Sequence, residues 1–360
     1  MLPIELWQII LNSSEFPTQL VIMSLNKRFY CCLRIIDLYH IDSRYRLKLT
    51  DNILKKCLHV KYLDASGWNC KISDEGIQHL KLEVLNAGGN GKITNNGISH
   101  LNLTTLIANN NENITNEGIK HMNLLNLDAS YTHINDEGIK HMNLMKLSAE
   151  ANPKITNRSI KLMNLKSLNA SDNYNITDEG IKHLDLTELG AANNEYITDK
   201  GIQHMNLNIL DASYNNKITN SGIEHMSLTS LNINGNLKIT DDIIACLPLK
   251  DLNISKCNIS DKGLKYLHLK ILIAYDNPHI TDKGIKLLLG LKRLDASGKC
   301  GITDKGIKYL KLDYLDKTDN NNITNIDNIT NIDNIGAIIY DDTSLFYKFS
   351  NIILEQFQFY

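Results

Sequence analysis

The chain of 360 residues has little proline, few aromatic residues and no regular set of cysteines. Five prolines leave no proline-rich linker, while 42% hydrophobic residues are too many for a disordered chain. The seven cysteines form no Cys-x-x-Cys pair, so the sequence indicates neither a disulfide framework nor a zinc-ligand set. Lys plus Arg (38) nearly balance Asp plus Glu (40), so the chain as a whole lacks the basic charge that nucleic acid or anionic lipid attracts.

The N-terminal sequence MLPIELWQIILNSSEF lacks the features of a secretory signal. It has no basic start, no uninterrupted apolar run and no small-residue cleavage site. No stretch reaches the about 18 apolar residues that a membrane span needs. We therefore expect an intracellular protein, cytoplasmic or nuclear and not secreted, with reduced cysteines and no membrane contact.

One phrase repeats from Asp74 almost to the C-terminus: Leu-x-x-Leu-x-Ala-Ser-x-Asn-x-x-Ile-Thr-Asp-x-Gly-Ile-x-x-Leu. A period of 20 to 22 residues is typical of a leucine-rich-repeat solenoid. We therefore predict an α/β fold with a parallel concave β-sheet and short convex helices. The glycine of the phrase, or its substitute, stands at Gly76, Gly97, Gly118, Gly138, Ser159, Gly180, Gly201, Gly222, Ile243, Gly263, Gly284 and Gly306.

Each repeat predicts one coil, as the unit from Leu165 to Leu184 illustrates. Alternation over residues 167–171 predicts a short strand with Leu168 and Ala170 in the core. Thr177 is placed to cap a helix of about two turns, and the glycine after it would let adjacent helices approach closely.

Two polar columns recur at fixed positions of the repeat. Asparagine recurs after the strand, at 90, 111, 152, 173, 194, 215, 236, 277 and 320, and its amide can satisfy backbone groups of the turn; an amide-lined ligand site is the alternative. Histidine recurs on the helix side, but Cys246, Tyr266, Leu287 and Tyr309 take the same slot. A metal site would not tolerate that exchange, so we expect no metal and no cofactor. The histidines are His79, His100, His121, His141, His183, His204 and His225.

The pattern divides the chain into three parts. Residues 1–40 do not repeat and predict a small helical module, which is too short to bury a large core alone. Residues 41–322 form the solenoid of about 12–13 coils, the first of them beginning near Arg46. Residues 323–360 comprise a low-complexity stretch and an apolar segment that we interpret as a C-terminal cap.

The N-terminal module resembles an F-box. Its Leu2-Pro3-Ile4-Glu5-Leu6 start and its Leu25-Asn26-Lys27-Arg28-Phe29 end match that pattern, and the following repeats are similar to those of the F-box/leucine-rich-repeat family. The resemblance implies docking on a Skp-family adaptor of a cullin–RING (SCF-type) ubiquitin ligase. The residues that it assigns to the adaptor are Leu2, Pro3, Leu6, Ile9, Ile10, Leu20, Leu25 and Phe29. The alternative is that these residues only pack the module onto the first coil.

The concave face would then hold the protein to be ubiquitinated. Acidic side chains outnumber basic ones at its outward positions, which favours a partner with a basic segment; a merely solvated polar surface is the alternative. Tyrosines among them are candidate anchors. The predicted substrate-binding residues are Asp128, Tyr131, Asp172, Asp211, Tyr214, Asp251 and Tyr275.

The predicted function is substrate recognition without catalysis. Tethering a target raises its effective concentration near an enzyme held on the same assembly. A leucine-rich scaffold without ligase association is the second interpretation. An enzyme is the third, because the sequence has no phosphate-binding loop, metal-ligand cluster or distinctive nucleophile. The acidic concave face disfavours nucleic acid.

Overall fold

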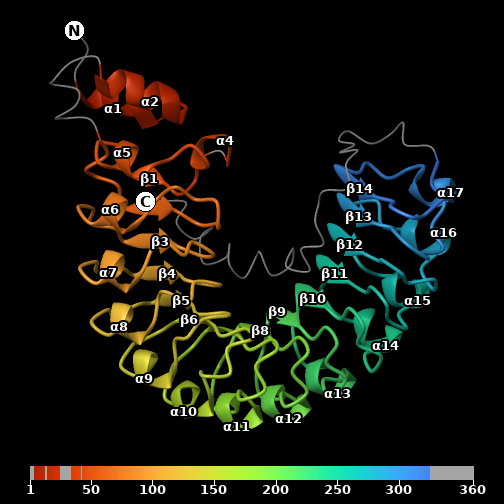
Figure 1. Cartoon of the computed structure of the whole chain (residues 1–360). Coiled ribbons are helices and arrows are strands. Elements are labelled where there is room, and N and C mark those ends of the chain that lie inside the picture. The colour runs from red at the N-terminus through yellow and green to blue at the C-terminus, as the bar shows by residue number, and fades with distance from the viewer. Residues whose placement is uncertain (1–3, 13, 25–33, 42, 325–360) are drawn as a thin grey trace. The chain divides into compact units, whose positions relative to one another are not determined.

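Figure 1 shows the protein in a computed structural model, which describes residues 4–12, 14–24, 34–41 and 43–324. The chain divides into two compact units, Met1–Met163 and Asn164–Tyr360. Within each unit, short strands line one face and short helices line the opposite face. We call these the strand face and the helix face. The predicted C-terminal cap lies, from residue 325 on, outside the described residues.

The first unit begins with two helices and continues as coils. Its elements are α1 (Ile4–Asn12), α2 (Phe16–Ser24), β1 (Asp37–Leu38), α4 (Ser43–Arg46), α5 (Asp51–Leu54), β2 (Tyr62–Asp64), α6 (Asp74–Ile77), β3 (Val84–Asn86), α7 (Asn95–Ile98), β4 (Thr105–Ile107), α8 (Asn116–Ile119), β5 (Asn126–Asp128), α9 (Asp136–Ile139), β6 (Lys146–Ser148) and α10 (Asn157–Ile160).

The second unit consists of coils throughout its described part. Its elements are β7 (Ser167–Asn169), α11 (Asp178–Ile181), β8 (Glu188–Gly190), α12 (Asp199–Ile202), β9 (Ile209–Asp211), α13 (Asn220–Ile223), β10 (Ser230–Asn232), α14 (Asp241–Ile244), β11 (Asp251–Asn253), α15 (Asp261–Leu264), β12 (Ile271–Ile273), α16 (Asp282–Ile285), β13 (Arg293–Asp295), α17 (Asp304–Ile307) and β14 (Tyr314–Asp316).

Neighbouring strands within each unit pair in parallel and in sequence order, as predicted. Their middle residues form a column of buried leucines, with Leu63 opposite Leu85 in the first unit and Leu210 opposite Leu231 in the second. The pairing already begins at β1, three residues before the predicted end of the N-terminal module. The leucine-rich-repeat fold is therefore confirmed in both units.

The helices of the coils are half as long as predicted. In α11 the backbone N–H of Lys182 donates to the carbonyl of Asp178 at 2.9 Å, and the N–H of Leu184 then donates to Ile181 at 2.8 Å. This tighter turn brings the chain back toward the next strand after four helical residues, about one turn. The prediction of two turns was wrong because part of the short period is used by this return.

The asparagine column satisfies backbone groups, as predicted. Asn194 is fully buried, and its Nδ2 donates to the carbonyls of Ala170, Asn173 and Ile176 at 2.8–3.1 Å. Its Oδ1 accepts from the backbone N–H of Tyr196 at 3.1 Å. One side chain therefore ties together two consecutive coils where they leave the strand face.

A second ladder links the helices. Asp178 accepts from the backbone N–H and the hydroxyl of Thr198 in the next coil, both at 2.7 Å. The glycine of the repeat makes room for this carboxylate, since a Cβ at Gly201 would lie 2.2 Å from Asp178 Oδ1. Ser159 fits the same slot by donating to Asp136 at 2.5 Å. The predicted close approach of helices is confirmed.

Candidate functional site

Two of the carboxylates predicted to bind substrate are buried. Asp128 is 6% exposed and Asp211 is 3% exposed. Each accepts the backbone N–H two residues on, from Ser130 at 3.0 Å and from Ser213 at 2.8 Å. The expectation that these side chains meet solvent was wrong, because the carboxylates shape the turn that follows each strand.

Burial also disfavours the charged form of two carboxylates in this column. Desolvation raises the pKa of Asp128, against the hydrogen bonds from Ser130. Desolvation likewise raises the pKa of Asp295, against the hydrogen bonds from Ser297. Asn86, Asn169 and other asparagines take the equivalent position in neighbouring coils and make the same turn bond. The number of aspartates at this strand position is therefore a poor measure of the electrostatic field that a partner would meet.

The turn after each strand contains one residue in the left-handed region of backbone space. Tyr131, Asp172 and Tyr214 occupy it with φ of 54°, 53° and 52°. Glycine or asparagine takes this position in several other coils, and Ala151, Lys256, Asp276 and Asp319 take it in the rest, although bulky residues adopt it only with strain. Tyr131 and Tyr214 are nevertheless about half exposed (47% and 45%). A strained and exposed aromatic residue is more typical of a binding site than of a scaffold.

Both tyrosines contact a residue of the next coil. The Tyr131 hydroxyl donates to Glu150 at 3.2 Å. The Tyr214 ring lies against Gly235, where a Cβ would come within 2.5 Å of the ring. Each ring therefore has one neighbour in the next coil while about half of its surface stays exposed.

The two remaining predicted residues lie on the strand face of the second unit. Asp251, the first residue of β11, is half-buried. Tyr275 is also half-buried, and Lys256 Nζ lies 4.8 Å from the centre of its ring. The structure therefore places all seven predicted residues along the strands or their exits, two in the first unit and five in the second.

Two further exposed tyrosines were missed at the sequence level. Tyr174 and Tyr196 are 50% and 59% exposed, and their rings meet edge to face with centres 6.1 Å apart. Asn193 donates to the Tyr174 hydroxyl at 3.3 Å. The sequence did contain a pattern that could have identified them. Tyrosine stands one residue after Asn173 and two residues after Asn194, where most other repeats have small or polar residues.

Half of the residues assigned to the adaptor lie within the described helices. Leu6, Ile9 and Ile10 fall in α1 and Leu20 falls in α2, whereas Leu2, Pro3, Leu25 and Phe29 lie outside the described residues. Ile10 is 36% exposed, Leu20 is half-buried and the neighbouring Val21 is 58% exposed. Burial of these helices instead uses Leu11, Ile22 and Met23.

Polar contacts join this module to the start of the solenoid. Gln8 accepts from the backbone N–H of Arg34 and donates to its carbonyl, at 2.9 and 3.0 Å. The Tyr45 hydroxyl of α4 donates to Glu15 at 2.6 Å. These polar contacts between the module and the start of the solenoid use residues other than the exposed Ile10 and Val21.

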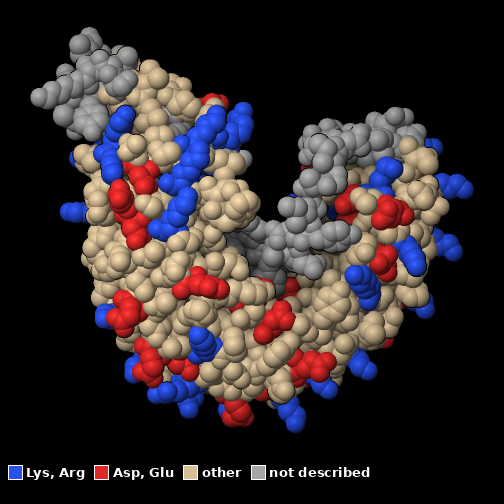
Figure 2. All heavy atoms as spheres, viewed as in Figure 1, with Lys and Arg blue, Asp and Glu red and all other residues tan. Residues whose placement is uncertain are grey.

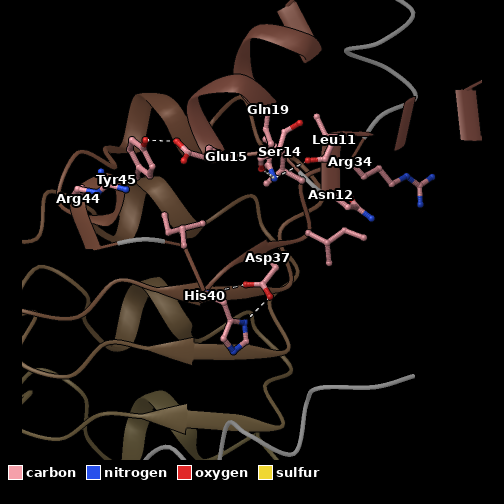
Figure 3. Close-up of a pocket in the computed structure, with 13 residues that line it drawn as sticks. Leu11, Asn12, Ser14, Glu15, Gln19, Arg34, Asp37, His40, Arg44 and Tyr45 are labelled. Atoms are coloured by element: carbon pink, nitrogen blue, oxygen red, sulfur yellow. Dashed lines mark hydrogen bonds and ion pairs between the residues drawn. The ribbon is translucent and has the colours of Figure 1, made fainter. Parts of the chain in front are cut away.

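A cavity of about 400 Å³ lies where the module meets the first coil (Figure 3). Several of its polar groups contact each other: His40 Nδ1 lies 2.7 Å from Asp37, and Gln19 donates to the carbonyls of Leu11 and Ser14, while the buried Gln19 Oε1 accepts no hydrogen bond from the described residues. The cavity is lined by Leu11, Asn12, Ser14, Glu15, Gln19, Arg34, Ile35, Ile36, Asp37, His40, Ile41, Arg44 and Tyr45.

The described residues contain no group of three or more His, Cys, Asp and Glu side chains that could hold a metal ion. Histidines of the repeat instead contact the preceding coil, as in His204, whose Nε2 lies 3.0 Å from the carbonyl of Leu184. No helix in the described ranges is long and apolar enough to cross a membrane.

Comparison with known proteins supports the fold. The family model for a leucine-rich repeat matches residues 245–267. The structure of a complex of Rad7 and Elc1 from yeast is similar at 17% identity and a TM-score of 0.55, over 75% of this chain and 85% of that one. An internalin from Listeria monocytogenes shares 21% identity at a TM-score of 0.46, over 79% and 89%. No curated protein matches the sequence.

Proposed function

We propose that this protein is the non-catalytic substrate-recognition subunit of an SCF-type cullin–RING ubiquitin ligase. Its N-terminal helices would dock on a Skp-family adaptor, and its coils would hold the target protein. The observation that carries the proposal is that α1 and α2 have both buried and exposed apolar side chains. Leu11, Ile22 and Met23 are buried, while Ile10 and Val21 remain exposed. Exposed apolar side chains within a segment that resembles an F-box are suited to bind a partner protein.

The target would bind along the strand exits. Tyr131 and Tyr214 supply large, rigid contact areas with polar tips, which is the property that enriches tyrosine at interfaces. The half-buried Asp172 and Asp251, rather than the buried Asp128 and Asp211, would attract a basic segment of the target. The protein would contribute proximity and no chemical step.

The similarity to Rad7 supports a role in a protein complex, since the structure of Rad7 was determined in complex with Elc1. A leucine-rich scaffold without a ligase is the second candidate function. It is favoured by the contacts of Gln8 and Glu15 with the first coil, because a module that only caps the solenoid needs no more than these.

Capture by a purified Skp-family adaptor distinguishes the two. We expect the full-length protein to be retained and Ile10→Arg to lose at least about 90% of the retention, since a buried charge at an interface centre costs several kcal/mol. Thr18→Arg, which adds the same charge at an exposed position of α2, should be retained like the wild type. Failure of the wild-type protein to bind would leave the scaffold function.

A further inference from the structure

Three consecutive coils, those of α15, α16 and α17, carry two lysines on the helix where other coils pair glutamate with lysine. The helix α10 also has two basic residues there, Arg158 and Lys161, but Arg158 forms an ion pair with Glu137 at 2.9 Å. The second helical residue is Glu117 in α8, Glu137 in α9 and Glu179 in α11, and each pairs with a lysine three residues on. In α15, α16 and α17 the same position is Lys262, Lys283 and Lys305, again followed by lysine three residues on. Like charges at this spacing destabilise a helix, so stability does not explain the exchange.

The histidine slot changes in the same three coils. Where α8, α9 and α11 are followed by His121, His141 and His183, the last coils carry Tyr266, Leu287 and Tyr309. These side chains are 66%, 52% and 70% exposed, and the adjacent Leu289 is 69% exposed. Lysine side chains lie against both tyrosines, with Lys265 Nζ 5.0 Å and Lys308 Nζ 5.3 Å from the ring centres.

The acidic residues of this region are engaged elsewhere. The first helical residues Asp261, Asp282 and Asp304 are half-buried and accept hydrogen bonds from Thr281, Thr303 and Thr324. Within residues 261–313, which the structure describes throughout, Asp313 is the one acid in the exposed class, and it lies 3.8 Å from Lys292. The exposed lysines on or beside the helices are Lys262, Lys265, Lys270, Lys283, Lys286, Lys292, Lys305, Lys308 and Lys311. Figure 2 shows blue side chains projecting along the outer edge of the coils that Figure 1 labels α15–α17.

We propose that the helix face of α15–α17 is a second interaction surface, which binds an acidic protein segment with interspersed bulky apolar residues. We call it the lysine–tyrosine surface, defined by Lys262, Lys283, Lys305, Tyr266, Leu287 and Tyr309. The lysines attract the carboxylates of the segment, and the exposed rings and leucine receive its apolar side chains. The apolar residues form a column one residue wide, which suits a linear segment better than a membrane plane. The proposal is independent of the adaptor site and of the strand exits.

The test is binding of a fluorescent peptide to the full-length protein, measured by anisotropy at low and at physiological salt. The probe is a 16-residue peptide in which Asp and Glu alternate with Leu and Tyr, and a second peptide replaces Leu and Tyr by Ser. Lys262→Glu/Lys283→Glu/Lys305→Glu and Tyr266→His/Leu287→His/Tyr309→His are the two variants. Both should fold, because the chain itself has Glu and His in these slots of other coils.

We expect saturable, salt-sensitive binding of the first peptide, weakened about tenfold by the charge variant and about fivefold by the histidine variant. Lys120→Glu/Lys140→Glu/Lys182→Glu makes the same change of net charge on other coils and should bind like the wild type. Equal loss in this control, equal binding of the serine peptide, or no binding of either peptide would overturn the proposal. Binding to phosphatidylserine vesicles with no binding of the peptide would replace the protein segment by a membrane.

Discussion

The buried and the exposed columns of this solenoid vary in different ways. The buried asparagine after the strand recurs in most coils from Asn90 to Asn320 and is at most 3% exposed, with the buried Thr132 and Cys257 in its place in two coils. The exposed slot after each helix changes from His183, His204 and His225 to Tyr266 and Tyr309. A hydrogen bond between neighbouring coils is needed at each step of the stack, whereas a partner needs its contacts at one place only.

This difference separates structural from functional residues. What recurs in most coils, namely the asparagine, the glycine and the Asp or Asn that begins the helix, is explained by hydrogen bonds and close packing between neighbouring coils. What departs from the repeat without a structural benefit, such as Tyr214 in a left-handed turn or Lys283 in place of glutamate, indicates a binding surface. The comparison can be broken by showing that a recurring residue is dispensable.

Removal of a buried asparagine should have the largest effect. Asn194→Ala deprives three buried carbonyls of their donor and should lower the free energy of unfolding by about 3 kcal/mol. Chemical denaturation of the full-length protein measures the change. Asn164→Ala removes an exposed amide from a neighbouring coil and should change stability by less than about 0.5 kcal/mol. Similar values for the two variants would refute the structural role of the column.

Filling the glycine slot should have the next largest effect. Gly201→Ala places a Cβ 2.2 Å from Asp178 Oδ1, so the carboxylate must leave its bonds to Thr198. We expect a loss of about 2 kcal/mol in thermal or chemical unfolding. Gly290→Ala is the matched control, because its nearest neighbours lie 3.8 Å away and the substitution should be close to neutral. A tolerated Gly201→Ala would show that the helix ladder can relax.

The smallest effect should have the opposite sign. Burial raises the pKa of Asp128, so the folded state disfavours the carboxylate at neutral pH. Asp128→Asn keeps the acceptor for Ser130 and should stabilise the protein by about 1 kcal/mol at pH 7. The folded state binds the proton of Asp128 more tightly than the unfolded state does. The gain should therefore shrink as the pH falls through the folded-state pKa of Asp128.

Thermal unfolding of the wild-type protein and of Asp128→Asn, from acidic to neutral pH, measures this gain in stability. Asp64→Asn serves as the contrast, since Asp64 occupies the same strand position but forms an ion pair with Arg46. Loss of this ion pair in Asp64→Asn should destabilise the protein. A destabilised Asp128→Asn would mean that the charge itself is required at that position.

The period predicted the fold because each coil is specified locally. The spacing of Leu168, Asn173 and Gly180 fixes a strand, a turn and a close helix contact within one repeat. The adaptor residues were named from a motif, and only four of the eight fall in described elements.

The sequence could not show which polar residues are buried. The sequence pattern predicts both Asp128 and Asp172 as outward acids, yet Asp128 is buried in a turn and Asp172 is half-buried. The two occupy different positions of the repeat, since Asp128 ends a strand and Asp172 lies in the left-handed turn that follows the next one but one. Helix length was overestimated because no residue pattern in the repeat distinguishes the helix from the turn that returns the chain to the next strand. The lysine–tyrosine surface was readable in principle, as an exchange of DEGIKH for DKGIKY.

Hydrogen–deuterium exchange of the full-length protein, with and without a purified Skp-family adaptor, tests the proposed ligase role most directly. We predict slower exchange in the peptides that cover α1 and α2, residues 4–24, and unchanged exchange over β9–β14. Unchanged exchange throughout, or protection confined to the coils, would contradict the account and leave a leucine-rich protein that binds its partners without an adaptor.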